Sequence, residues 1–149
     1  LLEELLVVLF KTIPGFEEVI PQARSAAEEM DLVVVNQSQD PLWSKGSEHF
    51  LVECKNWSSA VGSMEVCWFL NKIRNRGQPF GVLIAANGIT GSAADRMEAH
   101  NVVSKALADG IQMVMITRAE IEALTDSEEL VMMVKRKLCE LVVSGTVWP

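Results

Sequence analysis

The chain has 149 residues, of which 49 % are hydrophobic, and its formal net charge is −7 at pH 7. This composition excludes a disordered chain, and the length allows one domain that buries roughly two-thirds of its unfolded surface. No apolar run reaches the roughly eighteen residues of a membrane span, so we expect no membrane partner. The acidic balance argues against tight, sequence-independent binding of nucleic acid by this domain alone, because such affinity comes largely from neutralised phosphates.

The start of the chain and its cysteines bear on its origin. It begins Leu-Leu-Glu-Glu, without Met or a basic segment, so we expect no signal peptide and interpret it as a single domain from a longer protein. Its cysteines are Cys54, Cys67 and Cys139, widely spaced and odd in number. This pattern favours buried free thiols in a reducing, cytoplasmic compartment.

The first half of the chain is expected to form a helix and three strands. Leucines at helical spacing predict a helix over residues 1–12. Residues 16–20 predict a first strand, which Pro21 would stop. Strands over 31–37 and 49–55 follow, and the loop between them contains both Pro and Gly. We expect these last two strands to pair in antiparallel orientation.

The middle of the chain predicts a helix followed by a buried strand. Residues 61–76 are apolar around most of the helix circumference, including Met64, Cys67 and Trp68, so we expect a mostly buried helix. The uninterrupted apolar run 82–86 is typical of a strand that is covered on both faces.

The last part of the chain predicts three helices and one strand. Thr90 would cap a helix that extends to Asp109, and residues 112–116 form a last strand. Residues 117–120 and 125–128 have the capping-box pattern, which opens two closing helices. The order of elements predicts an α/β fold with a mixed central sheet flanked by helices.

Charged residues stand at the ends of two apolar strands. The triplet Glu53-Cys54-Lys55 closes the strand 49–55, and Asp31 opens the strand 31–37. Alternation in a strand places Glu53 and Lys55 on one face and Cys54 on the other. If the two strands pair, Asp31 can lie beside Glu53 and Lys55. The carboxylates of Asp31 and Glu53 then suit a hard divalent cation such as Mg²⁺. Such a cluster is typical of metal-assisted attack of water on a phosphodiester.

A simpler interpretation is that these are solvated charges at strand ends. An acidic residue two positions before Lys is expected by chance about once in a chain of this length, so the triplet alone is a weak signal. However, no other Asp or Glu of this chain has Lys two positions on, and the triplet ends a strongly apolar strand. Both observations favour the functional interpretation.

The segments 29–34 and 52–57, followed by 61–66, 81–86 and 87–90, resemble the PD-(D/E)xK nuclease superfamily. The similarity is to Mrr-like restriction endonucleases and archaeal Holliday-junction resolvases in particular, and it extends over roughly residues 1–112. It implies a restriction-endonuclease-like αβββαβ core followed by C-terminal helices. The chain departs from the family pattern by having Met30 instead of Pro before Asp31, and many Mrr-like members have Gln at the position of Glu53.

The resemblance also implies roles for individual residues. Asp31, Glu53 and the backbone carbonyl of Cys54 would hold Mg²⁺ or Mn²⁺, and Lys55 would orient the attacking water and stabilise developing charge. Glu29 and a glutamate of the first helix, Glu4 or its neighbour Glu3, would lie in the outer shell of the site. Five residues are candidates for contacts with nucleic acid: Asn56, Trp57, Lys72, Arg74 and Arg76. For each of them the alternative is an ordinary structural role.

We therefore expect a divalent-metal-dependent endonuclease that hydrolyses DNA, with RNA left open as a substrate. The resemblance adds a homodimer and other domains of the parent chain as partners. A rival interpretation is a catalytically degenerate nuclease fold that serves binding or regulation in a larger protein. A third is a flavodoxin-like domain with a coincidental triplet, which would need Asp31 and Glu53 on parallel strands joined by a helix; the segment 37–48 is a poor helix.

Overall fold

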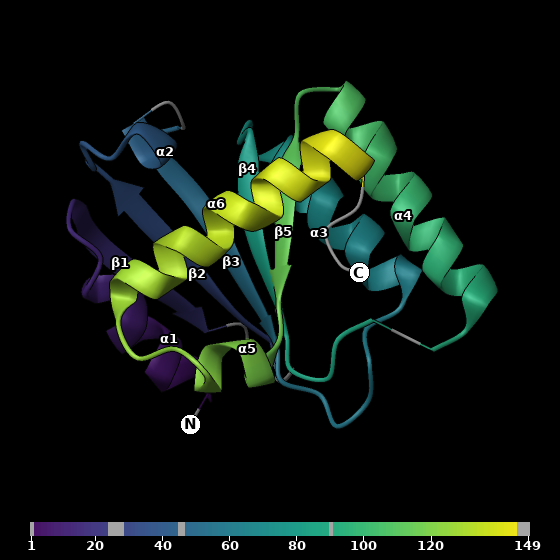
Figure 1. The fold of residues 1–149 in the computed structure, drawn as a ribbon, viewed down its shortest axis with the longest axis horizontal. Helices are drawn as coiled ribbons and strands as arrows, with labels where there is room; N and C mark the ends of the chain where they lie inside the picture. Colours follow the sequence, from purple (N-terminus) through teal and green to yellow (C-terminus); the bar gives the residue numbers. More distant parts are fainter. Residues whose placement is uncertain (1, 24–28, 45–46, 90, 146–149) are drawn as a thin grey trace.

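The computed structural model describes residues 2–23, 29–44, 47–89 and 91–145, with the backbone alone for residues 18, 22, 23 and 29–31. In these ranges a five-stranded sheet runs through the centre of the molecule (Figure 1). Its strands, which lie side by side in sequence order, are β1 (Phe16–Ala23), β2 (Glu29–Asn36), β3 (His49–Lys55), β4 (Phe80–Ala85) and β5 (Gln112–Ile116). The helices are α1 (Leu2–Lys11), α2 (Pro41–Ser44), α3 (Ser63–Asn75), α4 (Ala93–Ala108), α5 (Arg118–Glu122) and α6 (Ser127–Ser144).

The sheet is mixed. Strands β1, β2 and β3 are antiparallel neighbours, whereas β3, β4 and β5 are parallel and are connected through α3 and α4. Apart from the short α2 between β2 and β3, the order α1-β1-β2-β3-α3-β4 confirms the predicted αβββαβ core, and α6 confirms a C-terminal helix. Since β2 and β3 pair in antiparallel orientation, the flavodoxin-like alternative is wrong.

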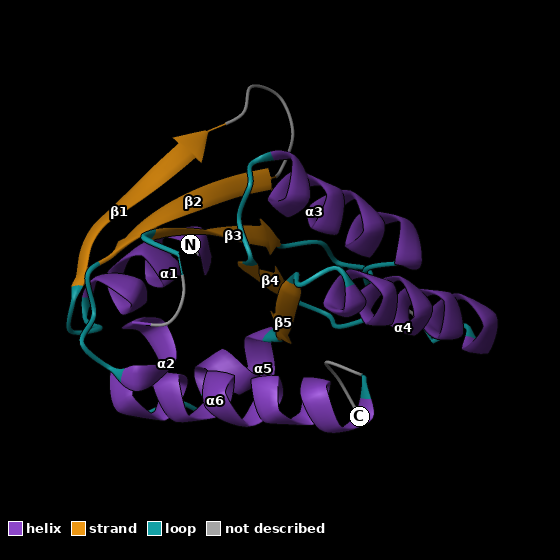
Figure 2. Ribbon diagram, turned by 90° about the horizontal axis from the view of Figure 1, so that it is seen from above, coloured by secondary structure: helices purple, strands orange, loops and turns teal. Residues whose placement is uncertain are grey.

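Helices cover both faces of the sheet (Figure 2). Helices α1, α2, α5 and α6 lie on one face, where they enclose an apolar core with alternate residues of β2, β3 and β4. Helices α3 and α4 lie on the other face and enclose a second core. Among the described residues, no helix is long and apolar enough to cross a membrane.

A glycine allows α3 to approach the sheet closely. A Cβ atom at Gly81 of β4 would lie 2.9 Å from Cζ of Phe69 and 2.9 Å from Cγ1 of Ile73. Real Cβ atoms do not approach other carbons this closely, so a residue with a side chain at this position would force Ile73 and Phe69 of α3 to shift. Gly81 therefore allows these two side chains of α3 to pack directly on β4.

The first strand is longer than predicted. Pro21 does not stop β1, which continues to Ala23 and pairs Pro21 with Leu32 of β2. The reason is that β1 pairs on one side only in the described sheet, and proline is tolerated on an edge strand because its missing N–H is not needed there. To predict where β1 ends, one must know that β1 is an edge strand, and the local sequence does not show the order of the strands.

Two helix starts also differ from prediction. Thr90 lies outside the described residues, and α4 begins after Ser92, whose hydroxyl accepts a hydrogen bond from the backbone N–H of Asp95. Helix α6 is capped by Asp126 and not by Thr125, because the Asp126 carboxylate accepts from the N–H of Glu129 at 2.9 Å. The capping box predicted from Thr117 is confirmed, since α5 begins with that geometry.

The predicted burial of α3 is wrong for its outer face. Met64 and Trp68 have 59 % and 57 % of their surface exposed, and Cys67 is half-buried. Helix α3 rests on the sheet and packs sideways against α4, so its remaining face is left to solvent. The expectation of buried thiols is also only partly right, because Cys54 is buried but Cys139 on α6 is exposed.

Candidate active site

The pairing of β2 with β3 brings the predicted acidic residues together. Asp31 lies directly opposite Glu53, and Glu29 lies directly opposite Lys55. Directly opposite positions of an antiparallel pair share a face of the sheet, with Cα atoms about 4.5–5.5 Å apart. In β3 the face that holds Glu53 also holds Leu51, which belongs to the core under α3 and α4. The register thus assigns all four charged positions to the face under α3.

Glu53 is almost completely buried and has two cationic partners. Its Oε1 atom lies 2.8 Å from Nζ of Lys55, and its Oε2 atom is in ionic contact with Nζ of Lys72 from α3. The side chains of Glu53 and Lys55 are each 3 % exposed, whereas that of Lys72 is 16 % exposed. A buried carboxylate without compensating charge would be strongly unfavourable, so these two ammonium groups compensate the charge of Glu53.

Trp57 forms a wall of this site beside Lys55. The Lys55 ammonium lies over the indole ring, 5.1 Å from its centroid, which is within the range of a cation–π interaction. Lys55 is therefore held between the Glu53 carboxylate and the face of an aromatic ring. Trp57 was predicted as a nucleic-acid contact, and the structure gives it this contact with Lys55.

Cys54 points away from the charged face into the opposite core, as strand alternation predicts. Burial, together with the nearby charge of Glu3, raises the pKa of the Cys54 thiol to about 12. The thiol therefore stays neutral near pH 7 and has no nucleophilic role. The proposed contribution of this residue is limited to its backbone carbonyl.

Other predicted residues lie further from Glu53. Asn56 accepts a hydrogen bond from Arg118 of α5 at 2.7 Å and is also hydrogen-bonded to Glu3 of α1. Glu4 is exposed and borders a shallow groove together with Asn56 and Arg118. Of the two first-helix candidates, the structure thus connects Glu3 with the residue that follows the triplet.

The basic residues predicted on the helix 61–76 separate into two groups. Arg74 turns towards α4, where its guanidinium lies 3.0 Å from the Asp109 carboxylate at the surface, and Arg76 is exposed beyond the end of α3. Only Lys72 reaches the site, and its contact with Glu53 was not predicted. One feature of the sequence could have indicated this contact: Lys72 lies between the apolar residues Leu70 and Ile73, both of which are buried.

The donor set suits a hard divalent cation. Carboxylate and carbonyl oxygens are the ligands that Mg²⁺ prefers, and Glu53 offers a buried carboxylate that already binds cations. Among the side chains that the structure describes, no three His, Cys, Asp or Glu residues form a group that could hold a metal. A metal site therefore depends on Asp31, which the backbone register brings opposite Glu53.

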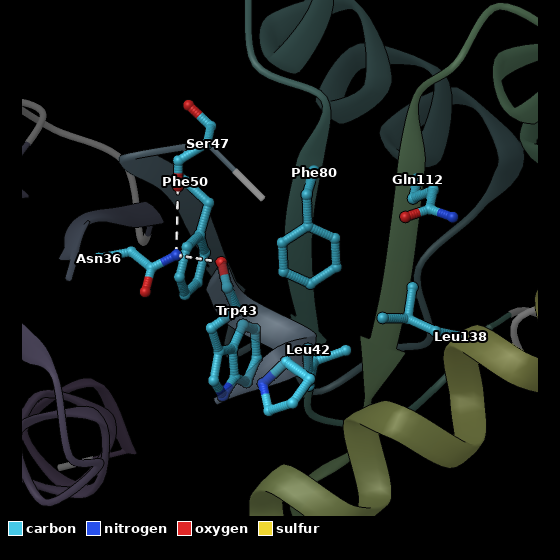
Figure 3. Close-up of a pocket in the computed structure, with 9 residues that line it drawn as sticks. Asn36, Leu42, Trp43, Ser47, Phe50, Phe80, Gln112 and Leu138 are labelled. Atoms are coloured by element: carbon cyan, nitrogen blue, oxygen red, sulfur yellow. Dashed lines mark hydrogen bonds between the residues drawn. The ribbon is translucent and has the colours of Figure 1, made fainter. Parts of the chain in front are cut away.

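A separate apolar pocket lies at the other end of the strands (Figure 3). It has a volume of about 250 Å³ and lies between α2, α6 and the first residues of β3, β4 and β5. The side-chain amide of Asn36 donates to the carbonyls of Trp43 and Ser47, at 2.8 and 3.2 Å, which ties α2 to the sheet. Glu53 and Lys55 lie at the opposite end of β3, so this pocket is not the candidate active site.

Comparison with known protein families agrees with this geometry. The family model Mrr_cat, described as a restriction endonuclease, matches residues 2–134. No curated protein matches the sequence. The matched range contains the whole five-stranded sheet and every residue of the candidate site. The chain therefore belongs to the Mrr_cat family of restriction endonucleases.

Proposed function

We propose that this domain is a divalent-metal-dependent endonuclease that hydrolyses phosphodiester bonds in DNA. The observation that carries the proposal is the register of β2 and β3, in which Asp31 lies opposite Glu53 while Lys55 is buried against the Glu53 carboxylate. Membership of a restriction endonuclease family supports the same reaction class. The proposal makes this site, at the ends of β2 and β3 nearest α3, the point of chemistry.

Each residue has a definite task in this proposal. Asp31, Glu53 and the backbone carbonyl of Cys54 hold Mg²⁺ or Mn²⁺, and Glu29 supports them from the outer shell. The cation, when bound, polarises the scissile phosphate and lowers the pKa of water. Lys55 donates hydrogen bonds to the attacking water and stabilises the negative charge that builds up on the phosphate oxygens. Trp57 and Glu53 keep the Lys55 ammonium in place for this role.

The acidic charge of the chain has to be reconciled with a polyanionic substrate. The net charge of −7 opposes DNA binding, and a bound divalent cation offsets it only locally. We infer that other domains of the parent chain, or a second copy of this domain, supply the remaining affinity. The net charge also favours the rival of a degenerate binding module, but the complete set of Asp31, Glu53 and Lys55 favours an enzyme.

Cleavage of DNA by the Asp31→Asn variant tests the proposal. Duplex and branched DNA are incubated with the wild-type domain in Mg²⁺ or Mn²⁺, with a chelator as the negative control. We expect Asp31→Asn to abolish cleavage, because the amide loses the charge that attracts the cation. The matched control is Asp109→Asn, which removes an exposed carboxylate on the far side of α3 and should leave the rate unchanged.

Metal titration separates the enzyme from the degenerate module. Calorimetry with Mn²⁺ should show one site in the wild-type domain and none in Asp31→Asn. A wild-type domain that takes up no Mn²⁺ would point to the degenerate module. Cleavage by Asp31→Asn at the wild-type rate would show that the metal ligands have been assigned wrongly.

A further inference from the structure

Two lysines contact the carboxylate of Glu53 in this site. Lys55 contacts Oε1 of Glu53, and Lys72 contacts Oε2, so both oxygens of the buried carboxylate are occupied by ammonium groups. A metal ion that coordinates either oxygen of Glu53 would lie close to the ammonium group that contacts the same oxygen. The two positive charges repel each other, which favours movement of one lysine away from its oxygen.

The formal charges on this face favour exchange of a lysine for a divalent cation. The register groups three acidic residues, Glu29, Asp31 and Glu53, with Lys55, and α3 adds Lys72. With both lysines in place the group has an excess of one negative charge. Replacing one ammonium by a divalent cation would bring the summed formal charge of the group to zero.

Lys72 is the lysine that lies nearer to solvent. Lys55 extends from the central strand β3, is 3 % exposed, and is also held over the Trp57 ring. Lys72 extends from a surface helix, is 16 % exposed, and lies on the same helix row as the exposed Trp68 and Met64. Among the described residues, Lys72 therefore has a larger exposed fraction than Lys55 and less of its side chain to uncover when it moves towards solvent.

We propose that Lys72 is a positioning residue that takes the place of the metal in the metal-free site. Its ammonium holds the Glu53 carboxylate in position until a divalent cation arrives and displaces Lys72 towards solvent and the bound DNA. This inference rests on the proposed metal-dependent function. It makes Lys72 a competitor of the metal, whereas a lysine that merely stabilised the fold would help the metal to bind.

Calorimetric titration of Mn²⁺ into the metal-free domain distinguishes these two roles. For Lys72→Gln we expect the Kd for Mn²⁺ to fall by about tenfold, because both the competitor and a repelling charge are removed. Lys72→Arg keeps the charge and should bind Mn²⁺ as the wild type does. The matched control is Lys105→Gln, the same substitution at an exposed position of α4, which should leave the Kd unchanged.

Labelling of lysines in the wild-type domain gives a second measurement that does not depend on a variant folding. An amine-reactive acetylating reagent is applied with and without saturating Mg²⁺, and the modified lysines are quantified by mass spectrometry. Displacement should make Lys72 react several-fold faster when Mg²⁺ is present, while Lys105 reacts at a constant rate. Unchanged or slower labelling of Lys72 would overturn the exchange.

The outcomes of the titration also separate the inference from the proposed function. A wild-type domain that binds no Mn²⁺ overturns both. A wild-type domain that binds Mn²⁺ while Lys72→Gln binds it equally or more weakly overturns only the role of Lys72. Tighter binding by Lys72→Gln, together with faster labelling of Lys72 in Mg²⁺, supports the exchange.

Discussion

Replacing Glu53 by Gln should destabilise the metal-free domain as well as inactivate it. The substitution keeps the shape of the side chain but removes the charge that compensates Lys55 and Lys72. Lys55 and Lys72 would then both lose their contact with the buried Glu53 carboxylate. Removal of one member of a buried ion pair is costly because the charge of the other member loses its nearest compensation in a poorly solvated place.

The size of this effect follows from the geometry. Nζ of Lys55 lies 2.8 Å from Oε1 of Glu53, and at an effective dielectric constant of about 20 two unit charges at this distance attract by about 6 kcal/mol. Desolvation offsets part of this attraction, and breaking a buried pair costs about 3–5 kcal/mol in other proteins. We expect the free energy of unfolding to fall by about 3 kcal/mol, or Tm by about 10 °C.

Urea unfolding followed by tryptophan fluorescence, with a chelator present, measures this change. Asp109→Asn is the control, because it breaks the surface pair with Arg74, in which both side chains are largely exposed. Such a pair should contribute less than about 1 kcal/mol. If Glu53→Gln unfolds at the same urea concentration as the wild type, Glu53 does not compensate the two lysines and the electrostatic reasoning fails.

Three further predictions concern other parts of the molecule. Gly81→Ala should lower the free energy of unfolding by about 1–3 kcal/mol in the same urea assay, because the added Cβ overpacks the contact with α3; equal stability would refute this. Burial opposes ionisation of Glu120, but hydrogen bonds from Lys137 and Thr117 outweigh it and lower its pKa below the usual 4.5. Glu120→Gln should therefore be less stable than the wild type at neutral pH, and the difference in Tm should vanish as the pH falls through that lowered pKa; a constant difference would argue against it. At pH 8, iodoacetamide should modify the exposed Cys139 and leave Cys54 unmodified in the folded domain, as read by mass spectrometry, because the Cys54 pKa is about 12; rapid labelling of Cys54 would contradict its burial.

The parts of the fold that depend on local sequence could be predicted well. The strand His49–Lys55 has the predicted bounds, and alternation along it correctly separates Glu53 and Lys55 from Cys54. The capping box at Thr117 needs only four consecutive residues and was also predicted correctly. In these cases backbone geometry alone determines which face or which N–H a side chain meets.

Features that depend on neighbours distant in sequence could not be predicted in the same way. Pro21 is compatible with β1 because that strand lies at an edge of the described sheet, and Trp68 is exposed because no described element covers the outer face of α3. The contact of Lys72 with Glu53 depends on how closely α3 packs on the sheet, where Gly81 leaves room for Phe69 and Ile73. None of these distances can be obtained from periodicity.

The alternation along β3 has a consequence for how this gene can vary. Inserting or deleting one codon ahead of Glu53 within the strand would exchange the two faces of every residue that follows. A carboxylate would then enter the hydrophobic layer beneath α1 and α6, and the thiol of Cys54 would face Lys72. A change of length by an odd number of codons within this strand would therefore invert its faces, whereas a base substitution leaves the alternation intact.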